Sequence, residues 1–323
     1  MKNKILHLEK NRYPLEALID LQKRHTVTFA EFKSQHDFDK YLKKNQFHAI
    51  FTKLGLHLGK SQILQQKELR YIITPTTGYN HIDIEYAQKR NIKIIGLKGE
   101  VDFLREIKST AEHTWALLLS ISKNLHNSIN SIKIKGIWDR ESFLNNELDG
   151  KTIGIIGYGR LGKIVSEYAN AFGMNIIAND IDDKAFKNVP SYVKKTELFR
   201  LLELSDYIVL LISWNKRNIK FLDTDKFKKF KKGAFFINTS RGEFVDEIAL
   251  LESLKKGKLK GAALDVLNND SSWDKSTKIK NLLIEYSKNN HNLIITPHVG
   301  GYGKFSVERT RAFITKLFLK EGL

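Results

Sequence analysis

The chain has 323 residues, of which 41% are hydrophobic, and a formal net charge of +18. This size allows a large buried core and favours more than one domain, whereas no apolar run reaches the roughly 18 residues that cross a bilayer. The absence of cysteine excludes disulfides and thiolate chemistry. The N-terminal sequence MKNKILHLEK lacks an apolar stretch long enough for a signal peptide, so we expect a cytoplasmic protein without membrane contact.

The positive charge comes from lysines spread along the whole chain. The densest cluster, KFKKFKKGAFF at 226–236, places lysines in pairs between phenylalanines, which is typical of an amphipathic helix end that runs into a strand. We therefore interpret the charge as a solvated surface and expect no nucleic-acid binding, with a polyanion site as the alternative. A basic surface also attracts an anionic substrate and an anionic cofactor.

Short apolar runs alternate with helical patterns from the N-terminus onward. The pattern predicts strands at 4–8, 25–29, 47–53, 70–75 and 92–96, and helices over 13–24, 37–45 and 82–91. Alternation of this kind predicts a parallel sheet covered by helices.

A long apolar helix is predicted over 109–129, and its apolar positions surround most of the helix. Such a helix should be buried against something large, for example a second subunit. A second alternating series follows, with strands at 152–156, 175–179, 207–212, 234–238, 261–264 and 293–296 and helices at 160–172, 196–204, 223–230 and 247–256. Asp246 suits the N-cap of the last of these helices. The tail 306–322 predicts one more helix.

These two series predict two α/β units with doubly wound parallel sheets. One unit is residues 1–98, completed by the tail at 298–323, and the other is 99–297. Because the chain passes twice between the units, we expect a cleft between them.

Three glycines follow the strand at 152–156. In the order of the chain, Gly157 permits a tight turn, Gly159 allows a pyrophosphate to touch the backbone, and Gly162 lets the next helix lie close to the strand. Asp180 ends the following strand, 18 residues after Gly162. A carboxylate there binds the ribose hydroxyls and repels a 2′-phosphate, which predicts NAD rather than NADP. The alternatives are glycines that serve only a strand–turn–helix and an Asp180 that is merely solvated.

Four polar residues lie where later strands of the second series end. They are Arg241, Asp265, Asp270 and His298. Ligands of open parallel sheets bind beyond the carboxyl ends of the strands, so these side chains can face one site.

Several stretches in register carry a resemblance to a known family. They are TTGYNHIDIEYAQKRNIKI, STAEHTWALLL, GIWDRESFLNNELDGKTIGIIGYGRLGK, INTSRGEFVDEIALLESLKKGKLKGAALDV and TPHVGG, which together cover about residues 70–305. The sequence resembles the D-isomer-specific 2-hydroxyacid dehydrogenases. This resemblance implies a Rossmann NAD-binding domain, a flavodoxin-like substrate domain, and hydride transfer between nicotinamide and C2 of a small anionic 2-hydroxy or 2-keto acid.

The resemblance also implies the roles of individual residues. Arg241 would clamp the substrate carboxylate, His298 would be the general acid–base, and Asp270 would be its carboxylate partner. The implied cofactor-binding residues are Gly157, Gly159, Arg160, Leu161, Gly162, Asp180, Thr239, Asp265 and Gly300, with Asp265 on the carboxamide. Thr76, Thr77, Gly78 and Tyr79 match the substrate loop. Trp138 and the long apolar helix match the dimerisation region, which implies a homodimer, and no metal is expected.

Structural interpretations stand beside these roles. Arg241 would otherwise be a buried ion-pair partner, Asp265 the cap of a turn, and His298 a structural histidine. At the level of the whole protein, the alternative is an NAD(H)-sensing or partner-recruiting protein with little turnover on the same scaffold. A nucleic-acid-binding protein is a third possibility.

The sequence departs from the family pattern at three places. Asp270 stands where the family has Glu followed by Pro, so the contact with His298 would be displaced, bridged by water, or made by Asp274 instead. The family's His-x-Pro segment is replaced by Leu211-Ile212-Ser213. Extra residues around 100–106 suggest an insertion that borders the substrate cleft and reshapes specificity.

Overall fold

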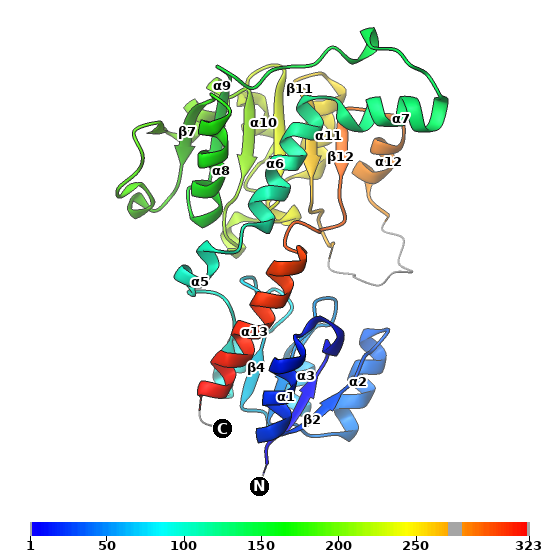
Figure 1. Ribbon diagram of the computed structural model, residues 1–323, viewed down its shortest axis with the longest axis vertical. Helices are drawn as coiled ribbons and strands as arrows, with labels where there is room; N and C mark the ends of the chain where they lie inside the picture. The colour runs from blue at the N-terminus through cyan, green and yellow to red at the C-terminus, as the bar shows by residue number, and fades with distance from the viewer. Residues whose placement is uncertain (1, 271–279, 322–323) are drawn as a thin grey trace. The chain divides into compact units, whose positions relative to one another are not determined.

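The computed structural model describes residues 2–270 and 280–321. The chain forms two parallel sheets, one of five strands and one of seven, each covered by helices (Figure 1). This is the predicted fold class of two α/β units. Among the described residues, no helix is both long and apolar enough to span a membrane.

The two sheets belong to two compact units of the chain. The first unit contains the residues up to Glu106 together with those from Gly303 onward. The second contains the described residues of 107–270 and 278–302. The functional domain boundaries expected from the sequence, after residues 98 and 297, stay a prediction.

The first unit has the flavodoxin-like strand order. Its strands are β1 (Lys4–His7), β2 (Thr26–Phe29), β3 (Ala49–Phe51), β4 (Tyr71–Ile73) and β5 (Lys93–Ile95). They pair in parallel in the order β2-β1-β3-β4-β5. The predicted strands of this part of the chain are therefore all present.

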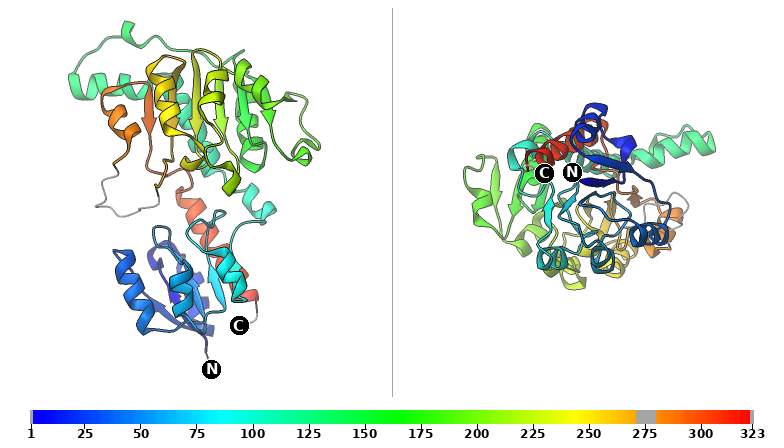
Figure 2. Two further views of the ribbon diagram at one scale, coloured as in Figure 1. Left: turned by 180° about the vertical axis from the view of Figure 1, so that it is seen from behind. Right: turned by 90° about the horizontal axis from the view of Figure 1, so that it is seen from below.

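Helices cover both faces of the first sheet (Figures 1 and 2). They are α1 (Leu15–Arg24), α2 (Gln35–Lys44), α3 (Lys60–Gln65), α4 (Ile84–Lys89), α5 (Val101–Arg105) and α13 (Lys304–Lys320). The C-terminal α13 packs on α1, and α2, α3 and α4 pack on one another. Because both faces are covered, adjacent strand residues such as Ile5 and Leu6 are both fully buried.

The second unit has the Rossmann strand order. Its strands are β6 (Thr152–Ile156), β7 (Asn175–Asn179), β8 (Val193–Lys195), β9 (Tyr207–Leu210), β10 (Ala234–Asn238), β11 (Leu259–Leu264) and β12 (Leu293–Ile295). They pair in parallel in the order β12-β11-β10-β9-β6-β7-β8. The order reverses beside β6, so the chain after β6 lies at the switch point where such sheets bind ligands.

Two layers of helices cover the second sheet. The helices of the unit are α6 (Ser109–Ser122), α7 (Leu125–Lys135), α8 (Arg160–Ala171), α9 (Leu198–Leu204), α10 (Thr224–Lys229), α11 (Glu247–Lys255) and α12 (Leu282–Asn289). Figure 1 shows α6 and α8 on one face, and α9, α10 and α11 cover the other face in Figure 2. Asp246 accepts hydrogen bonds from the amides of Ile248 and Ala249, which confirms the predicted N-cap of α11.

The prediction of a single helix over 109–129 is wrong. The structure has two helices, α6 and α7, because Asn124 adopts a φ of 52°, which interrupts an α-helix. The apolar sides of α6 are buried against α8, β10 and β11 of its own unit. In this part of the chain, the exposed large apolar residues lie on α7 and in the segment after it.

The other differences concern short elements and ends. Sequence patterns missed α3, α5, α12 and β8, which have three to eight residues. Elements this short have too few residues to show a period. The strand expected over 207–212 ends at Leu210, where the chain turns across the glycine loop.

Candidate active site

The three glycines after β6 differ in what surrounds them. Gly157 has a φ of 96°, and a Cβ there would lie 2.8 Å from the backbone nitrogen of Ile212. A Cβ on Gly162 would lie 2.3 Å from the carbonyl oxygen of Gly157. A Cβ on Gly159 would meet no atom within 4 Å. Gly157 and Gly162 are thus required by the protein itself, whereas the open space at Gly159 fits a phosphate that approaches the backbone.

The first turn of α8 offers amide hydrogens to such a phosphate. No side chain caps this helix, whose N-cap is Gly159, and a helix N-terminus favours negative charge. The side chain of Arg160 donates from Nη1 to the carbonyl oxygen of Ile107 at 2.7 Å. Leu161 packs partly against the core. The side chains of Arg160 and Leu161 are therefore engaged within the protein, and their contact with a cofactor stays a prediction.

Asp180 lies directly after β7 and beside the glycine loop. Its Oδ2 accepts a hydrogen bond from the amide of Tyr158 at 2.8 Å, and its Oδ1 accepts one from the amide of Asp182 at 2.9 Å. The carboxylate is therefore oriented by the backbone on both sides. This position fits the ribose of an adenosine whose phosphates lie over Gly159.

Arg241 follows β10 and is largely buried. Its Nη1 donates to the carbonyl oxygen of Ser240 at 2.7 Å, while its Nε is buried and has no hydrogen-bond partner among the described residues. Burial lowers the pKa of the guanidinium, and the charges of Asp270 and Glu243 act in the opposite direction. A buried cationic N–H without an acceptor is costly, so a bound anion would stabilise this side chain.

His298 and Asp270 are in direct contact. The Nδ1 of His298 lies 2.9 Å from Oδ2 of Asp270, and the two side chains are 24% and 17% exposed. The shorter Asp side chain thus reaches the ring without a bridging water. Asp274, the other carboxylate considered for this role, lies outside the described residues.

Asp265, at the end of β11, is surrounded by hydrogen-bond donors. Its Oδ1 accepts from Thr296 Oγ1 at 2.6 Å and from the amide of Val299 at 2.9 Å, and its Oδ2 accepts from the amide of Gly300 at 2.8 Å. His113 Nε2 lies 3.2 Å from Oδ1. Burial would raise the pKa of Asp265, but these hydrogen bonds outweigh it and lower the pKa. The carboxylate therefore caps the turn after His298, which was the structural interpretation of this residue.

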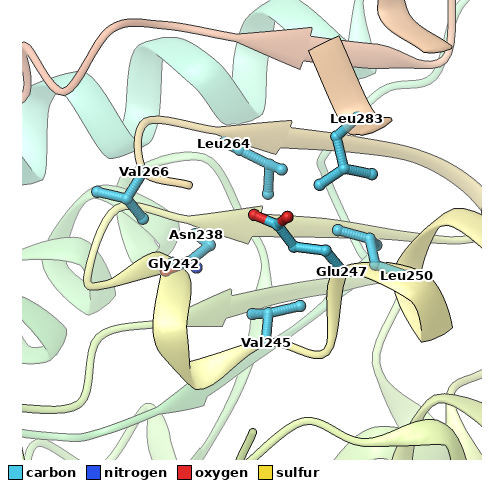
Figure 3. Close-up of a pocket in the computed structure, with 8 residues that line it drawn as sticks. All are labelled: Asn238, Gly242, Val245, Glu247, Leu250, Leu264, Val266 and Leu283. Atoms are coloured by element: carbon cyan, nitrogen blue, oxygen red, sulfur yellow. The ribbon is translucent and has the colours of Figure 1, made fainter. Parts of the chain in front are cut away.

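The loop that carries Asp270 is held by Glu247 at the start of α11. Glu247 accepts from the amide of Asn268 and from the side-chain amide of Asn281, both at 2.7 Å. Figure 3 shows its carboxylate in a small hollow whose lining includes Leu264 and Leu283. This region is packed interior that supports the Asp270 loop.

Thr239, the remaining residue predicted to bind the cofactor, follows β10. It is buried, and its Oγ1 lies 2.6 Å from Oγ1 of Thr114 on α6. The side chain is therefore tied to α6. As for Gly300, its carbonyl oxygen accepts from Ser109 Oγ at 2.7 Å.

The predicted substrate loop, Thr76, Thr77, Gly78 and Tyr79, lies after β4 in the first unit. The Thr76 hydroxyl donates to the carbonyl oxygen of Gly78 at 2.8 Å. The Tyr79 hydroxyl accepts from the amide of Lys98 at 3.3 Å, and its ring packs where Gly96 leaves no Cβ. Burial raises the pKa of Tyr79, against this hydrogen bond. The loop is thus shaped by its own side chains.

The extra residues around 100–106 form α5, which packs on α13 within the first unit. The ring of Phe103 stacks on Phe313 with centroids 3.8 Å apart, and Glu106 pairs with Arg309. The influence of this insertion on specificity stays a prediction.

The segment that departs from the family's His-x-Pro pattern still contacts the glycine loop. The backbone of Leu211 and Ile212 lies against Gly157, so the change of side chains leaves this contact in place. Trp214 stacks on Phe244, with centroids 5.7 Å apart.

Sequence reasoning missed several residues that support the site. His113 and Ser109 on α6, together with Thr296, contact the turn around His298, and Glu247 holds the Asp270 loop. His113 and Thr296 are 183 positions apart in the chain. A local sequence pattern cannot predict a contact over this separation. His113 does, however, belong to STAEHTWALLL, one of the stretches that resemble the family.

Comparison with known proteins gives the family. The NAD-binding domain of the D-isomer specific 2-hydroxyacid dehydrogenases matches residues 115–300. A Staphylococcus aureus protein, assigned by its name to the 2-hydroxyacid dehydrogenases, is 32% identical over 284 residues, which are 87% of this chain and 84% of that protein. The chain belongs to the D-isomer specific 2-hydroxyacid dehydrogenase family, and it is an NAD-dependent oxidoreductase of that class.

Solved structures agree over nearly the whole chain. A Thermus thermophilus protein has a TM-score of 0.83 at 26% identity, covering 99% of this chain and 97% of that one. D-lactate dehydrogenase from Aquifex aeolicus, solved with NAD and lactic acid, has a TM-score of 0.80 at 27% identity, covering 99% and 96%. The fold is therefore shared across both units.

Proposed function

We propose that the enzyme interconverts a D-2-hydroxy acid and the corresponding 2-keto acid, with Arg241 binding the substrate carboxylate and His298 acting as general acid–base. The observation that carries this proposal is the convergence of Arg241, Asp270 and His298. Asp270 touches the ring of His298, and its negative charge opposes the lowering of the Arg241 pKa by burial. A cation and an imidazole thus share one carboxylate neighbour.

The buried Nε of Arg241 supports its role toward an anion. Within residues 2–270 and 280–321 this N–H has no acceptor, and a substrate carboxylate would supply one. The planar guanidinium suits two oxygens at once.

The contact with Asp270 determines which ring atom of His298 exchanges a proton. Asp270 occupies Nδ1, so Nε2 is the atom that serves the C2 oxygen. When NADH is bound, its nicotinamide supplies a hydride to C2 of the keto acid. His298 gives a proton to the C2 oxygen in this direction and takes it back in the other, while Asp270 stabilises the imidazolium.

NADH is expected to be preferred over NADPH. Asp180 is oriented by the amides of Tyr158 and Asp182 and would meet the 2′-phosphate with a negative charge. Thr76, Thr77, Gly78 and Tyr79 stay a prediction as substrate contacts, as do the cofactor contacts of Thr239, Asp265 and Gly300.

The test is a spectrophotometric screen of a broad panel of 2-keto acids with NADH and NADPH in parallel. We expect turnover of at least one acid with NADH. Arg241→Ala should lower kcat/KM roughly 100-fold or more, because truncating one partner of a buried charge pair costs about 2–5 kcal/mol. Arg241→Lys keeps the charge without the planar fork and serves as the matched variant. NADH binding without turnover of any acid would favour a sensor instead.

We also propose that the enzyme is a homodimer. The residues that support this are the apolar ones on α7 and in the following segment, which extend away from the second sheet (Figure 1). Trp138 is 90% exposed and Ile134 74% exposed, and exposed apolar surface of this kind marks an interface. Sedimentation should show a dimer that Trp138→Asp converts to a monomer.

Location in the cytoplasm stays a prediction that cell fractionation can check.

A further inference from the structure

We propose that His113, near the N-terminal end of α6, is a positioning residue for His298. It acts through Thr296 and Asp265 and does not touch the substrate. This inference rests on the proposed role of His298 as general acid–base. All four residues belong to the second unit, so the argument needs only contacts within that unit.

His298 has an unusual backbone conformation that something must hold. Its φ is 54°, in the left-handed region that few residues other than glycine adopt. The amides of the next two residues, Val299 and Gly300, both donate to Asp265, at 2.9 and 2.8 Å. Asp265 therefore holds the turn from the side that follows His298, and the direction of the ring depends on this carboxylate.

His113 holds this carboxylate in turn, and the hydrogen-bond directions can be worked out. Asp265 is 2% exposed and accepts from Thr296 Oγ1 at 2.6 Å. Its lowered pKa makes it an acceptor only, so the proton of that bond belongs to Thr296. The Thr296 oxygen then accepts from His113 Nε2, which lies 3.0 Å away. His113 must therefore carry a proton on Nε2.

The first residue of α6 holds the loop after His298 at a second point. Ser109 donates to the carbonyl oxygen of Gly300 at 2.7 Å. A Cβ on Gly300 would lie 2.8 Å from Oδ2 of Asp265 and 3.4 Å from Cδ2 of His113. At Gly300 the loop is thus packed closely against Asp265 and His113, without space for a side chain.

Loss of the Nε2 donor should affect turnover more than cofactor binding. Without it, the Thr296 hydroxyl is no longer oriented and Asp265 loses donors, so the turn at His298 is held less firmly. Displacement of a catalytic group by about 1 Å can cost 10²-fold in rate. The glycine loop, by contrast, makes none of these contacts.

The experiment compares His113→Met, which removes the donor, with His113→Gln, whose amide nitrogen restores one near Nε2. We expect His113→Met to lower kcat about 10- to 100-fold, with KM for the keto acid and the NADH dissociation constant each changed less than about threefold. His113→Gln should recover most of kcat. Thr296→Val, which removes the intermediate hydroxyl at constant size, should reproduce the loss if His113→Met does not fold.

The matched control is His126→Met on α7. His126 makes a similar hydrogen bond, from Nε2 to the carbonyl oxygen of His291 at 3.0 Å, but contacts no residue of the His298 turn. Its kcat should equal that of the wild type, with gel filtration confirming an unchanged oligomeric state. A kcat of His113→Met equal to that of this control would overturn the inference, as would a His113→Gln variant as slow as His113→Met.

A crystal structure of His113→Met separates this inference from the proposed function. We expect a changed Thr296 rotamer and a shifted turn over 296–301. If the turn and the left-handed φ of His298 are unchanged, the inference is wrong whatever the activity. If the wild type turns over no 2-keto acid while the turn shifts, the proposed function fails and the positioning contact stands.

Discussion

In the second unit, three glycines beside the site pack against backbone, whereas in the first unit the glycine beside the predicted substrate loop packs against a side chain. Gly157, Gly162 and Gly242 each face main-chain atoms at distances that exclude a Cβ. In the first unit, Gly96 faces the ring of Tyr79 instead. A main-chain contact accepts only glycine at a fixed position, and a side-chain contact can be built in many ways. This difference explains why the second unit carries recognisable motifs and the first has few.

The largest expected effect concerns the chemistry proposed for the second unit. His298→Asn should lower kcat by about 10²- to 10⁴-fold, because the general acid–base is lost. NADH affinity, measured by fluorescence titration, should stay within about threefold, since the glycine loop makes no contact with this ring. The same substitution at the exposed His291 is the control. Loss of NADH binding in His298→Asn would show that the histidine is structural.

A second prediction tests the backbone contacts of the second unit. Gly242→Ala should lower the free energy of unfolding by about 3 kcal/mol. The new Cβ would lie 1.9 Å from the carbonyl carbon of Leu267, at the start of the loop that carries Asp270. Urea denaturation measures the effect.

Gly159→Ala is the matched control for Gly242→Ala. Because a Cβ on Gly159 meets no protein atom, stability should fall by less than about 1 kcal/mol, the scale of an N-cap change. NADH affinity should nevertheless drop, since the space belongs to the phosphates. An equal loss of stability in both variants would contradict the proposal that the protein itself requires Gly242 whereas only the ligand requires Gly159.

The third prediction concerns the buried His7 of the first unit. Burial lowers its pKa from 6.5 to about 3, and the charge of Arg311 acts in the same direction. Between these two values the unfolded chain binds more protons than the folded one, so stability falls as the pH drops below 6.5. The loss should be about 2 kcal/mol at pH 5.

His7→Phe should remove this pH dependence. The ring of His7 already stacks on Phe51, with centroids 4.9 Å apart, so phenylalanine fits the aromatic surroundings. Urea denaturation is measured at pH 7 and pH 5. Hydrogen exchange of peptides from β1 serves as the readout that is specific for the first unit. His36→Phe at an exposed position is the control, and identical pH slopes in wild type and His7→Phe would contradict the prediction.

The smallest effect should come from the side-chain contact of the first unit. Gly96→Ala places a Cβ 2.3 Å from the Tyr79 hydroxyl oxygen, and the ring can swing away. We expect a loss of about 1 kcal/mol in unfolding free energy and a raised KM for the keto acid at unchanged NADH affinity. A loss as large as that of Gly242→Ala would show that the two units are equally rigid at these points.

The sequence by itself predicted both sheets, the N-cap at Asp246, and the glycine loop with Asp180, because each leaves a local pattern of apolar period, cap or spacing. It predicted one helix over 109–129 where there are two, because the spacing of apolar residues does not show that Asn124 adopts the left-handed conformation. Elements as short as β8 and α5 were missed for a related reason: they owe their conformation to neighbours in the fold.

Only the tertiary structure brought Arg241, Asp270 and His298 together and showed that the Asp270 side chain reaches Nδ1 directly. It also revealed His113 and Thr296 behind the His298 turn. Hydrogen bonds of this kind join residues that are distant in the chain, and their distances depend on how helices pack on the sheet. Periodicity and spacing record the conformation of neighbouring residues, whereas the direction of the His298 ring is decided by contacts between distant parts of the second unit.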